Sequence, residues 1–427
     1  MTVEALYDIY LQNPNIQTDT RKLKAGDLYF ALKGEHFNGN QFALEAIEKG
    51  AAYAIIDEAI FANHDRCILV HDVLDSLQQL SKHHRQQFTI PFLAITGSNG
   101  KTTTKELIHA VMATTFKTVA TKGNLNNHIG VPLTVLSIPK ETEFAIIEMG
   151  ANHQREIASY CTYALPNFGL INNCGKAHLE GFGGIEGVRK GKGELYDFLK
   201  EHQGIIFRNA DFDYLKEMAT GIEKQITYGE FEGDYRGKII SSNGQEGLQV
   251  AILNAGKECT IKSQLIGTYN FANILAAVAV GSYFGITIDK IKTAIECYVP
   301  DNSRSQLIRR GSTDIILDAY NANPSSMQVA IQNFASMNYP KKIVLLGGMK
   351  ELGDDSLKEH QLVVDLLVKN NFEHVLLVGG DFNKTNHNYP FVENNVQARD
   401  WFLKQPIENT AVLIKGSRAF MMEKIID

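Results

Sequence analysis

The chain has 427 residues, of which 44% are hydrophobic and 21% are charged, values typical of an ordinary globular protein with roughly two to four domains. A net charge of −6 argues against a nucleic-acid-binding protein, which would need a basic surface, and no apolar run approaches the ~20 residues of a membrane span. The N-terminal residues do not resemble a secretory signal and the five cysteines lack C-x-x-C spacing, so we expect a cytoplasmic protein with reduced thiols.

Residues 1–88 alternate predicted strands with predicted helices, which is typical of a small α/β domain. Apolar runs and helical periodicity predict strands over 27–32, 51–56 and 67–70 and helices over 41–49 and 73–86. The turns at 24–27 and 33–34 could let a ligand approach the backbone, although an ordinary surface turn is the simpler explanation.

Residues 90–112 predict a strand, a glycine loop and a helix. The apolar run ends at TGSNGKTTT (96–104), where the glycines let successive backbone N–H groups curl round an anion at the start of the helix. Lys101 can reach the outer phosphates of a nucleotide, and the Thr102 hydroxyl can ligate Mg²⁺. We predict nucleotide contacts from Gly97, Ser98, Asn99, Gly100, Lys101, Thr102 and Thr103.

The spacing of this loop differs from the general phosphate-loop pattern. That pattern places four residues between its first glycine and the Gly-Lys-Thr triplet, which would put a glycine at position 95, where this chain has Ile95. An incidental glycine turn is therefore an alternative. The coincidence of a strand, two glycines, a lysine and several hydroxyl residues favours a phosphate loop.

Three further polar side chains in the central part of the chain are candidate ligands. Glu148 ends an apolar strand, where a metal-directed carboxylate belongs, although a solvated glutamate at a strand end is the alternative. His178 follows another apolar strand, but a lone histidine is more often structural. Lys192 belongs to a basic run on a predicted helix, and such a run is ordinarily a solvated face. The corresponding strands are expected over 144–151 and 168–171, and the helix over 186–199.

The rest of the central part combines an amide-rich segment, short strands and a helix. Residues 121–132 are rich in asparagine. Residues 204–266 contain short strands with turn signals at Tyr228-Gly229, Glu232-Gly233 and Asn243-Gly244, which indicates a β-rich insert against the sheet. A helix then runs from about 267 to 284, and Asn270 and Asn273 share one of its faces.

The last part of the chain, from about residue 300, predicts a second doubly wound sheet. Four apolar strands, each ending in a glycine or asparagine turn, are expected over 314–317, 342–346, 375–378 and 411–414. Asn323 is a natural N-cap with Pro324 at the first helical position, so a helix should begin there. We therefore predict domains over 1–88, 89–299 and 300–427.

Together these motifs resemble the Mur ligase family, the ATP-dependent amide-bond ligases of peptidoglycan precursor synthesis, along the whole chain. The sequence TGSNGKTT matches the family's phosphate loop, including its short spacing. The resemblance implies that Thr102, Glu148 and His178 bind Mg²⁺ and that Lys101, Glu148, His178 and Lys192 are catalytic. In several members the lysine at the position of Lys192 is carbamylated and holds a second Mg²⁺.

The family's nucleotide motifs also have counterparts. G-x-H-N-x-x-N appears as GTYNFAN, with tyrosine in place of the common histidine. The resemblance implies that Asn270 and Asn273 lie on the adenine side of ATP. It also implies that Arg304, the last residue of DNSR (301–304), reaches the nucleotide and that Asp318 lies in the segment facing it.

The resemblance extends to the substrates. The first domain is similar to the uridine-binding domain of the last two ligases of the pathway. The motifs GNLNNHIGVP (123–132), DAYNANP (318–324) and GGMKELG (347–353) are similar to the final one, which joins D-alanyl-D-alanine to UDP-N-acetylmuramoyl-tripeptide. The implied substrate contacts are Thr20, Arg21, Lys33, Gly34, Asn126, Asn127, Asn321 and Asn323.

The resemblance implies an α/β fold of three domains: a small uridine-binding domain, a central phosphate-loop ATPase with a parallel sheet, and a C-terminal doubly wound Rossmann-like domain. It implies ATP and Mg²⁺ as cofactors, an acyl-phosphate intermediate, and a part in cell-wall synthesis and thereby in cell shape and division. It also implies two small-molecule substrates and a monomer, with neither nucleic-acid nor membrane partners.

Three alternatives remain open at this point. The preceding ligase adds the third amino acid to UDP-N-acetylmuramoyl-dipeptide and shares most of these motifs. Folylpolyglutamate synthetase shares the ATPase core, but the uridine-type first domain argues against it. A non-catalytic nucleotide-binding protein is also conceivable, although the joint presence of Lys101, Glu148, His178 and Lys192 speaks against lost catalysis.

Overall fold

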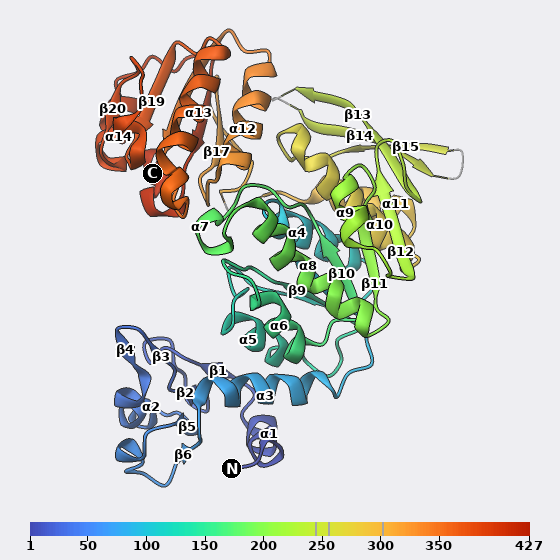
Figure 1. The fold of residues 1–427 in the computed structure, drawn as a ribbon, viewed down its shortest axis with the longest axis vertical. Coiled ribbons are helices and arrows are strands. Elements are labelled where there is room, and N and C mark those ends of the chain that lie inside the picture. The colour runs from blue at the N-terminus through green and yellow to red at the C-terminus, as the bar shows by residue number, and fades with distance from the viewer. Residues whose placement is uncertain (244–245, 255–256, 301–302) are drawn as a thin grey trace. The chain divides into compact units, whose positions relative to one another are not determined.

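The computed structural model describes residues 1–243, 246–254, 257–300 and 303–427 (Figure 1). The chain is an α/β protein that divides into two compact units. The first contains residues 1–94, 116–151 and 155–168, and the second contains residues 95–115, 152–154 and 169–427. The predicted α/β class is confirmed, whereas the domain boundaries near 88 and 299 remain a prediction. Within the described ranges, no helix has both the length and the apolar character that crossing a bilayer requires.

The N-terminal part of the first unit is a parallel sheet with the strand order β1-β2-β5-β6. Its elements are α1 (Val3–Gln12), β1 (Ile16–Gln17), β2 (Leu28–Phe30), α2 (Ala43–Glu48), β5 (Tyr53–Ile56), β6 (Cys67–Leu69) and α3 (Val73–Arg85). Because side chains alternate along a strand, Leu28 and Phe30 pack with residues of α1 and α3, whereas Tyr29 packs with residues of α2. The predicted strands and helices of this part are confirmed, and α1 and β1 were not predicted.

A small hairpin follows β2. It consists of β3 (Lys33–Gly34) and β4 (Phe37–Asn38), which pair antiparallel, and a 3₁₀ turn (Gly39–Phe42) comes next. A Cβ atom at Gly39 would lie 2.5 Å from the carbonyl oxygen of Leu32, so only glycine fits where the hairpin returns to the sheet. The predicted turn at 33–34 is therefore part of an ordered hairpin.

The rest of the first unit contains β7 (Phe92–Thr96), whose last two residues belong to the second unit, together with β8 (Thr118–Ala120), α5 (Gly130–Leu136), β9 (Phe144–Glu148) and α6 (Glu156–Ala164). These strands lie in the order β7-β9-β8, and α3 packs on α5 and α6. The Arg85 guanidinium on α3 donates to Ala164 O at 3.2 Å and lies 3.8 Å from the centre of the Phe92 ring. Burial lowers the pKa of Arg85 to about 10.

The second unit begins with the end of β7. Its phosphate-loop part contains helices and strands in the order β15-β14-β13-β12-β11-β10, and the first residue of β10, Phe168, belongs to the first unit. Its elements are α4 (Lys101–Met112), β10 (Phe168–Ile171), α7 (Leu179–Phe182), α8 (Ile185–Glu201), β11 (Ile205–Asn209), α9 (Asp213–Met218), β12 (Lys224–Gly229), β13 (Tyr235–Asn243), β14 (Gly247–Asn254), β15 (Lys257–Lys262), α10 (Phe271–Tyr283) and α11 (Ile288–Cys297). The apolar helix α10 packs against α4, which confirms the helix predicted from 267 to 284.

The expected insert over 204–266 is wrong in its placement. These strands join the sheet edge to edge instead of packing against it: β11, β12 and β13 pair in parallel, and β13, β14 and β15 pair antiparallel. Short strands with turn signals predict strand content but not the partner of each strand. The predicted turn at Asn243-Gly244 includes Gly244, which lies outside the described residues.

The C-terminal part of the second unit is a six-stranded sheet in the order β16-β17-β21-β18-β19-β20, coloured orange to red in Figure 1. Its elements are β16 (Gln306–Arg310), β17 (Thr313–Asp318), α12 (Pro324–Ser336), β18 (Lys341–Gly347), α13 (Ser356–Lys369), β19 (His374–Val378), β20 (Phe391–Val392), α14 (Asn395–Phe402) and β21 (Thr410–Lys415). All neighbouring strands are parallel except β16 and β17. The four predicted strands and the helix start at Pro324 are confirmed, and the edge strands β16 and β20 were missed.

Candidate active site

The glycine loop has the geometry of an anion cradle. The fully buried strand β7 ends at Thr96, and α4 begins at Lys101. Gly97 has a φ of +144° and Gly100 a φ of +81°, conformations that suit glycine. A Cβ atom at Gly97 would lie 2.9 Å from the Cβ of Asn172. The loop therefore leads directly into the N-terminus of α4, the arrangement found in anion sites at helix N-termini.

The side chains of the loop are placed for phosphate chemistry. Lys101 Nζ donates to the carbonyl oxygen of Gly97 at 2.6 Å and lies 3.4 Å from that of Ser98, so its charge is held at the loop. Thr102 and Thr103 are buried at the start of α4, with exposed fractions of 4% and 7%. The strand, loop and helix predicted from the sequence are confirmed, and the nucleotide contacts assigned to this loop remain a prediction.

Glu148 lies at the buried end of β9 in the first unit and is 1% exposed. Its Oε1 accepts a hydrogen bond from Asn126 Nδ2 at 2.8 Å, and its backbone N–H donates to Thr121 Oγ1 at 2.9 Å. The alternative of a solvated glutamate at a strand end is therefore wrong. Asn127 Oδ1 accepts from the backbone N–H groups of Ile129 and Gly130, so this side chain closes the turn before α5.

His178 and Lys192 occupy different surroundings in the second unit. His178 has a φ of +52° immediately before α7, and its Nδ1 contacts the carboxylate of Glu351, which has a φ of +62°. Lys192 is 1% exposed on α8, with Nζ 5.0 Å from the centre of the Phe182 ring. Lys192 is thus buried, and the interpretation of its helix as an ordinary solvated face is wrong at this position. Among the described residues, no three His, Cys, Asp or Glu side chains gather into a metal-binding group.

The adenine-side candidates form hydrogen bonds with protein groups. Asn270 Nδ2 donates to Ile266 O at 2.8 Å, and Asn273 Nδ2 donates to Asn270 Oδ1 at 2.9 Å. Asn273 Oδ1 accepts from the hydroxyl of Thr104 on α4 at 3.0 Å. The structure therefore brings Asn273 against the phosphate-loop helix, and a contact of either asparagine with adenine remains a prediction.

The candidates of the C-terminal part contact charged or aromatic side chains. Asp318 forms an ion pair with the buried Lys415 at 2.5 Å, and the Arg304 guanidinium lies 3.8 Å from the centre of the Tyr320 ring. Asn321 is exposed, and its carbonyl oxygen is 3.4 Å from Lys415 Nζ. In the predicted motif DNSR, the residues at 301 and 302 lie outside the described residues.

A hydrogen bond from α12 and an ion pair from α13 are among the contacts that connect the phosphate-loop region with the C-terminal part. Asn323 caps α12 through Oδ1, which accepts from Ser326 N at 2.9 Å, and its Nδ2 donates to Asn99 Oδ1 at 2.8 Å. The exposed Lys176 forms an ion pair of 2.6 Å with Glu359, whose side chain is 5% exposed. The loop that carries Asn99 therefore contacts the start of α12 directly.

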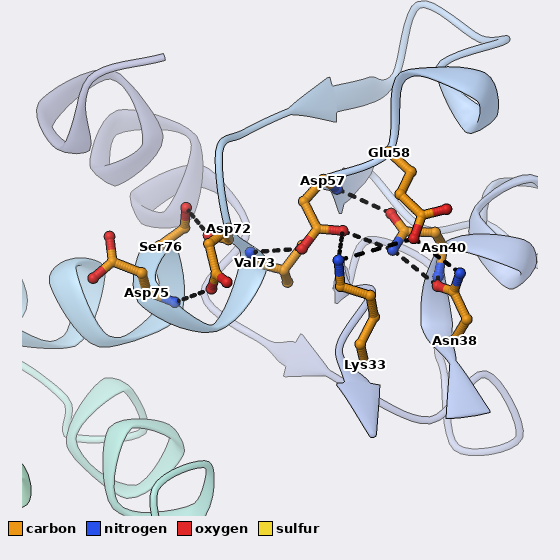
Figure 2. Close-up of polar contacts among 9 residues, drawn as sticks. All are labelled: Lys33, Asn38, Asn40, Asp57, Glu58, Asp72, Val73, Asp75 and Ser76. Carbon is orange, nitrogen blue, oxygen red and sulfur yellow. Dashed lines mark hydrogen bonds and ion pairs between the residues drawn. The ribbon is translucent and has the colours of Figure 1, made fainter. Parts of the chain in front are cut away.

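Lys33, a substrate candidate of the first unit, belongs to a polar cluster around the Asp57 carboxylate, whose side chain is 4% exposed (Figure 2). Lys33 Nζ lies 3.1 Å from Asp57 Oδ1 and 3.9 Å from Glu58 Oε1. Asp57 also accepts from Asn40 Nδ2 at 2.8 Å and from Val73 N at 3.3 Å. Gly34 follows Lys33 in β3. Thr20 and Arg21 make local contacts instead: Thr20 donates to Glu45 at 3.1 Å, and the exposed Arg21 pairs with Asp19 at 2.8 Å.

Several residues around the phosphate loop were not predicted. Thr104, Asn172 and Asn173 contact the loop or its helix through side-chain hydrogen bonds. The only sequence signal was the pair of asparagines directly after the apolar strand 168–171, at the edge where ligands bind in open α/β sheets.

The fold and the phosphate loop define a nucleotide-binding α/β protein, and three family models match most of its length. The Mur ligase family catalytic domain matches residues 14–85, the Mur ligase middle domain matches 95–281, and the Mur ligase glutamate ligase domain matches 303–418. The chain belongs to the Mur ligase family, as the sequence motifs predicted.

Particular relatives cover nearly the whole chain. The UDP-N-acetylmuramoyl-tripeptide–D-alanyl-D-alanine ligase of Bacillus subtilis (strain 168) is 36% identical, covering 96% of this chain and 92% of the relative. The ligase of the same name from Escherichia coli (strain K12) is 33% identical with the same coverage of both chains. The crystal structure of MurF from Thermotoga maritima in complex with ADP is similar, with a TM-score of 0.87 and 26% identity over 97% of each chain. MurF from Acinetobacter baumannii has a TM-score of 0.88 and 29% identity, covering 100% of this chain and 97% of that one.

Proposed function

We propose that this chain is the ATP-dependent ligase that adds D-alanyl-D-alanine to UDP-N-acetylmuramoyl-tripeptide and releases ADP and phosphate. The observation that carries the proposal is the full-length similarity to relatives of that name, at 33–36% identity, combined with an intact phosphate loop. The similarity spans all three family models, including residues 14–85, where we expect the UDP-linked substrate to bind.

The reaction proceeds in two balanced steps. The terminal carboxylate of the tripeptide attacks the γ-phosphorus of ATP, which forms an acyl phosphate and breaks the bond to ADP. The amine of D-alanyl-D-alanine then adds to the activated carbonyl, loses a proton, and expels phosphate from the tetrahedral intermediate. Such phosphoryl transfer depends mainly on positioning and on neutralising charge. We assign this work to Lys101 and the N–H groups at the start of α4, which would bind the phosphates.

By the chemistry of their donor atoms, the proposed ligands suit a Mg²⁺ ion bound with ATP. Thr102 and Glu148 offer hard oxygen donors at buried positions, which Mg²⁺ prefers. His178 would offer Nε2 as its donor atom, because Nδ1 contacts Glu351. A carbamate on Lys192 would add two oxygens and change a buried cation into an anion. Bound there, Mg²⁺ would neutralise charge on the transferring phosphoryl group.

Substrate-dependent product formation tests the proposal. Wild-type protein is incubated with ATP, Mg²⁺, UDP-N-acetylmuramoyl-tripeptide and D-alanyl-D-alanine. The products are then separated, and their masses are measured by mass spectrometry. We expect a product equal to the two substrates minus one water. A product formed instead from UDP-N-acetylmuramoyl-dipeptide and a diamino acid would assign the preceding ligase, and binding of ATP with no product from either pair would favour a non-catalytic protein.

We also propose the compartment and the oligomeric state. The described cysteines are all free, which suits the reducing cytoplasm where ATP is available. The resemblance to the family further supports a monomer, which size-exclusion chromatography with light scattering would test. A stable dimer at working concentration would contradict that part of the proposal.

A further inference from the structure

The segment Asn172–Gly175, directly after β10, lies along the phosphate loop. Asn173 Oδ1 accepts the backbone N–H of Asn99 at 3.0 Å, and Asn173 Nδ2 donates to the carbonyl oxygen of Asn99 at 3.1 Å. The backbone carbonyl of Asn173 accepts the N–H of Ser98 at 2.9 Å. One carboxamide thus satisfies both backbone groups of Asn99, as a residue on a neighbouring antiparallel strand would.

A second pair of hydrogen bonds continues this contact. Ser98 Oγ donates to the carbonyl oxygen of Gly175 at 2.9 Å and accepts the N–H of Gly175 at 3.0 Å. Two successive residues of the phosphate loop, Ser98 and Asn99, are therefore each held by two or more hydrogen bonds from one segment. That segment lies outside the loop, so it can fix the loop's shape without touching a phosphate.

Asn172 contacts the other end of the loop, where Gly100 leads into α4. Its Nδ2 donates to Thr104 Oγ1 at 2.6 Å and to Asn273 Oδ1 at 3.2 Å. A Cβ atom at Gly100 would lie 2.7 Å from Asn273 Oδ1 and 3.1 Å from Asn172 Nδ2, so the last glycine of the loop packs directly on this amide pair. Thr104 is fully buried, and Asn172 and Asn273 are each 6% exposed.

We propose that Asn172 and Asn173 are positioning residues that hold the phosphate loop in its nucleotide-binding conformation before the nucleotide arrives. The inference rests on the proposed function, because it assumes that ATP binds at this loop. Gly97 and Gly100 make the isolated loop conformationally free, and a free loop loses entropy when it closes on a ligand. Hydrogen bonds that order the loop beforehand reduce this loss and so raise nucleotide affinity.

The test compares nucleotide binding with stability in the full chain. N173A removes both side-chain bonds to Asn99, and T104V removes the hydroxyl that links Asn172 with Asn273. We expect each variant to weaken ADP binding, measured by calorimetry with Mg²⁺, by about tenfold or more, and to raise the KM for ATP in proportion. The KM for UDP-N-acetylmuramoyl-tripeptide should stay unchanged. T104S keeps the hydroxyl and should restore ADP affinity.

T313V is the matched control, because the buried Thr313 hydroxyl donates to Ile407 O at 2.6 Å in the C-terminal sheet. It should lower the melting temperature without changing ADP affinity. If N173A and T104V lower the melting temperature as T313V does but bind ADP like the wild type, the proposal is overturned. If N173A does not fold, the ADP affinities of T104V and T104S still test the proposal: equal affinities in these two variants would overturn it. Absence of ADP binding by the wild type would instead contradict the proposed function, and this inference with it.

Discussion

Asp57 is a buried carboxylate that connects three segments of the first unit (Figure 2). It accepts hydrogen bonds from Asn40, from Lys33 on the hairpin β3–β4 and from the N–H of Val73 at the start of α3. Burial raises the pKa of Asp57, but these hydrogen bonds outweigh burial and leave the pKa below its ordinary value of 3.8. The ionised form therefore stabilises the arrangement of the hairpin.

The depressed pKa of Asp57 predicts an acid-dependent loss of stability. A carboxyl whose pKa is lower in the folded chain contributes its full stability above the unfolded pKa and loses it as the pH falls through the folded value. We expect wild type to be more stable than D57N by a constant margin between about pH 5 and pH 7, and this margin to shrink below the ordinary value of 3.8. Urea unfolding of both proteins across this range measures it, and a margin that grows as the pH falls would contradict the assignment.

Lys192 provides a second prediction at the scale of one residue. Lys192 is buried, whereas Lys190 on the same helix is exposed. If a carbamate on Lys192 holds metal, K192A should lose about 10²-fold or more in kcat, and small carboxylates such as acetate should restore part of it. K190A is the matched control and should retain wild-type activity. Full activity of K192A, or loss without any rescue, would count against the carbamate.

The sequence predicted the local geometry of residues that belong to a continuous motif. It did not predict contacts or burial that depend on segments far away in the chain. Gly97, Gly100 and Lys101 form a continuous motif, and their backbone geometry follows from it. Asn172 contacts Asn273, 101 positions away, a proximity that no spacing rule contains. The burial of Lys192 was missed for the same reason, because a helical charge pattern does not reveal which face another segment covers.

At the scale of elements, the start of α12 combines two functions in one side chain. Asn323 Oδ1 caps the helix by accepting Ser326 N, and Asn323 Nδ2 donates to Asn99 on the phosphate loop. The variant N323D retains the capping oxygen and loses the amide donor, whereas N323A loses both. The two variants therefore separate the helix cap from the contact with Asn99.

We expect N323A to destabilise the start of α12 by about 1 kcal/mol and N323D to leave it nearly unchanged. Hydrogen exchange of the backbone amides in the first turn of α12, Ser326 above all, should be faster in N323A than in wild type or N323D. Equal acceleration in both variants would mean that the contact with Asn99, and not the cap, stabilises this turn.

Among the central and C-terminal strands, those that the sequence located individually are the ones with a continuous apolar run. The central strands β7, β9, β10, β17, β18, β19 and β21 are buried runs bounded by turns, and all were predicted. The edge strands differ: β16 is only half-buried or exposed along its length, and β20 has two residues. The partners of β13, β14 and β15 depend on sheet topology, and for this reason the sequence could not distinguish an extended sheet from a separate insert.

At the scale of the whole molecule, the chemistry requires that water be excluded. An acyl phosphate hydrolyses when it is exposed to water, so ligases of this kind benefit from closing their active site over the substrates. We expect an ATP analogue together with UDP-N-acetylmuramoyl-tripeptide to reduce the radius of gyration in small-angle X-ray scattering. A scattering profile that is unchanged by both ligands would contradict closure.

The most direct test of the account is phosphate release from ATP by the full chain, measured with each substrate alone and with both. We predict sustained turnover only when UDP-N-acetylmuramoyl-tripeptide and D-alanyl-D-alanine are both present, because the acyl phosphate must form and then be consumed. K101A should reduce that rate by about three orders of magnitude, whereas K238A, which changes an exposed lysine paired with Glu258, should not. Turnover that needs neither substrate, or a K101A rate close to that of wild type, would contradict the central claim.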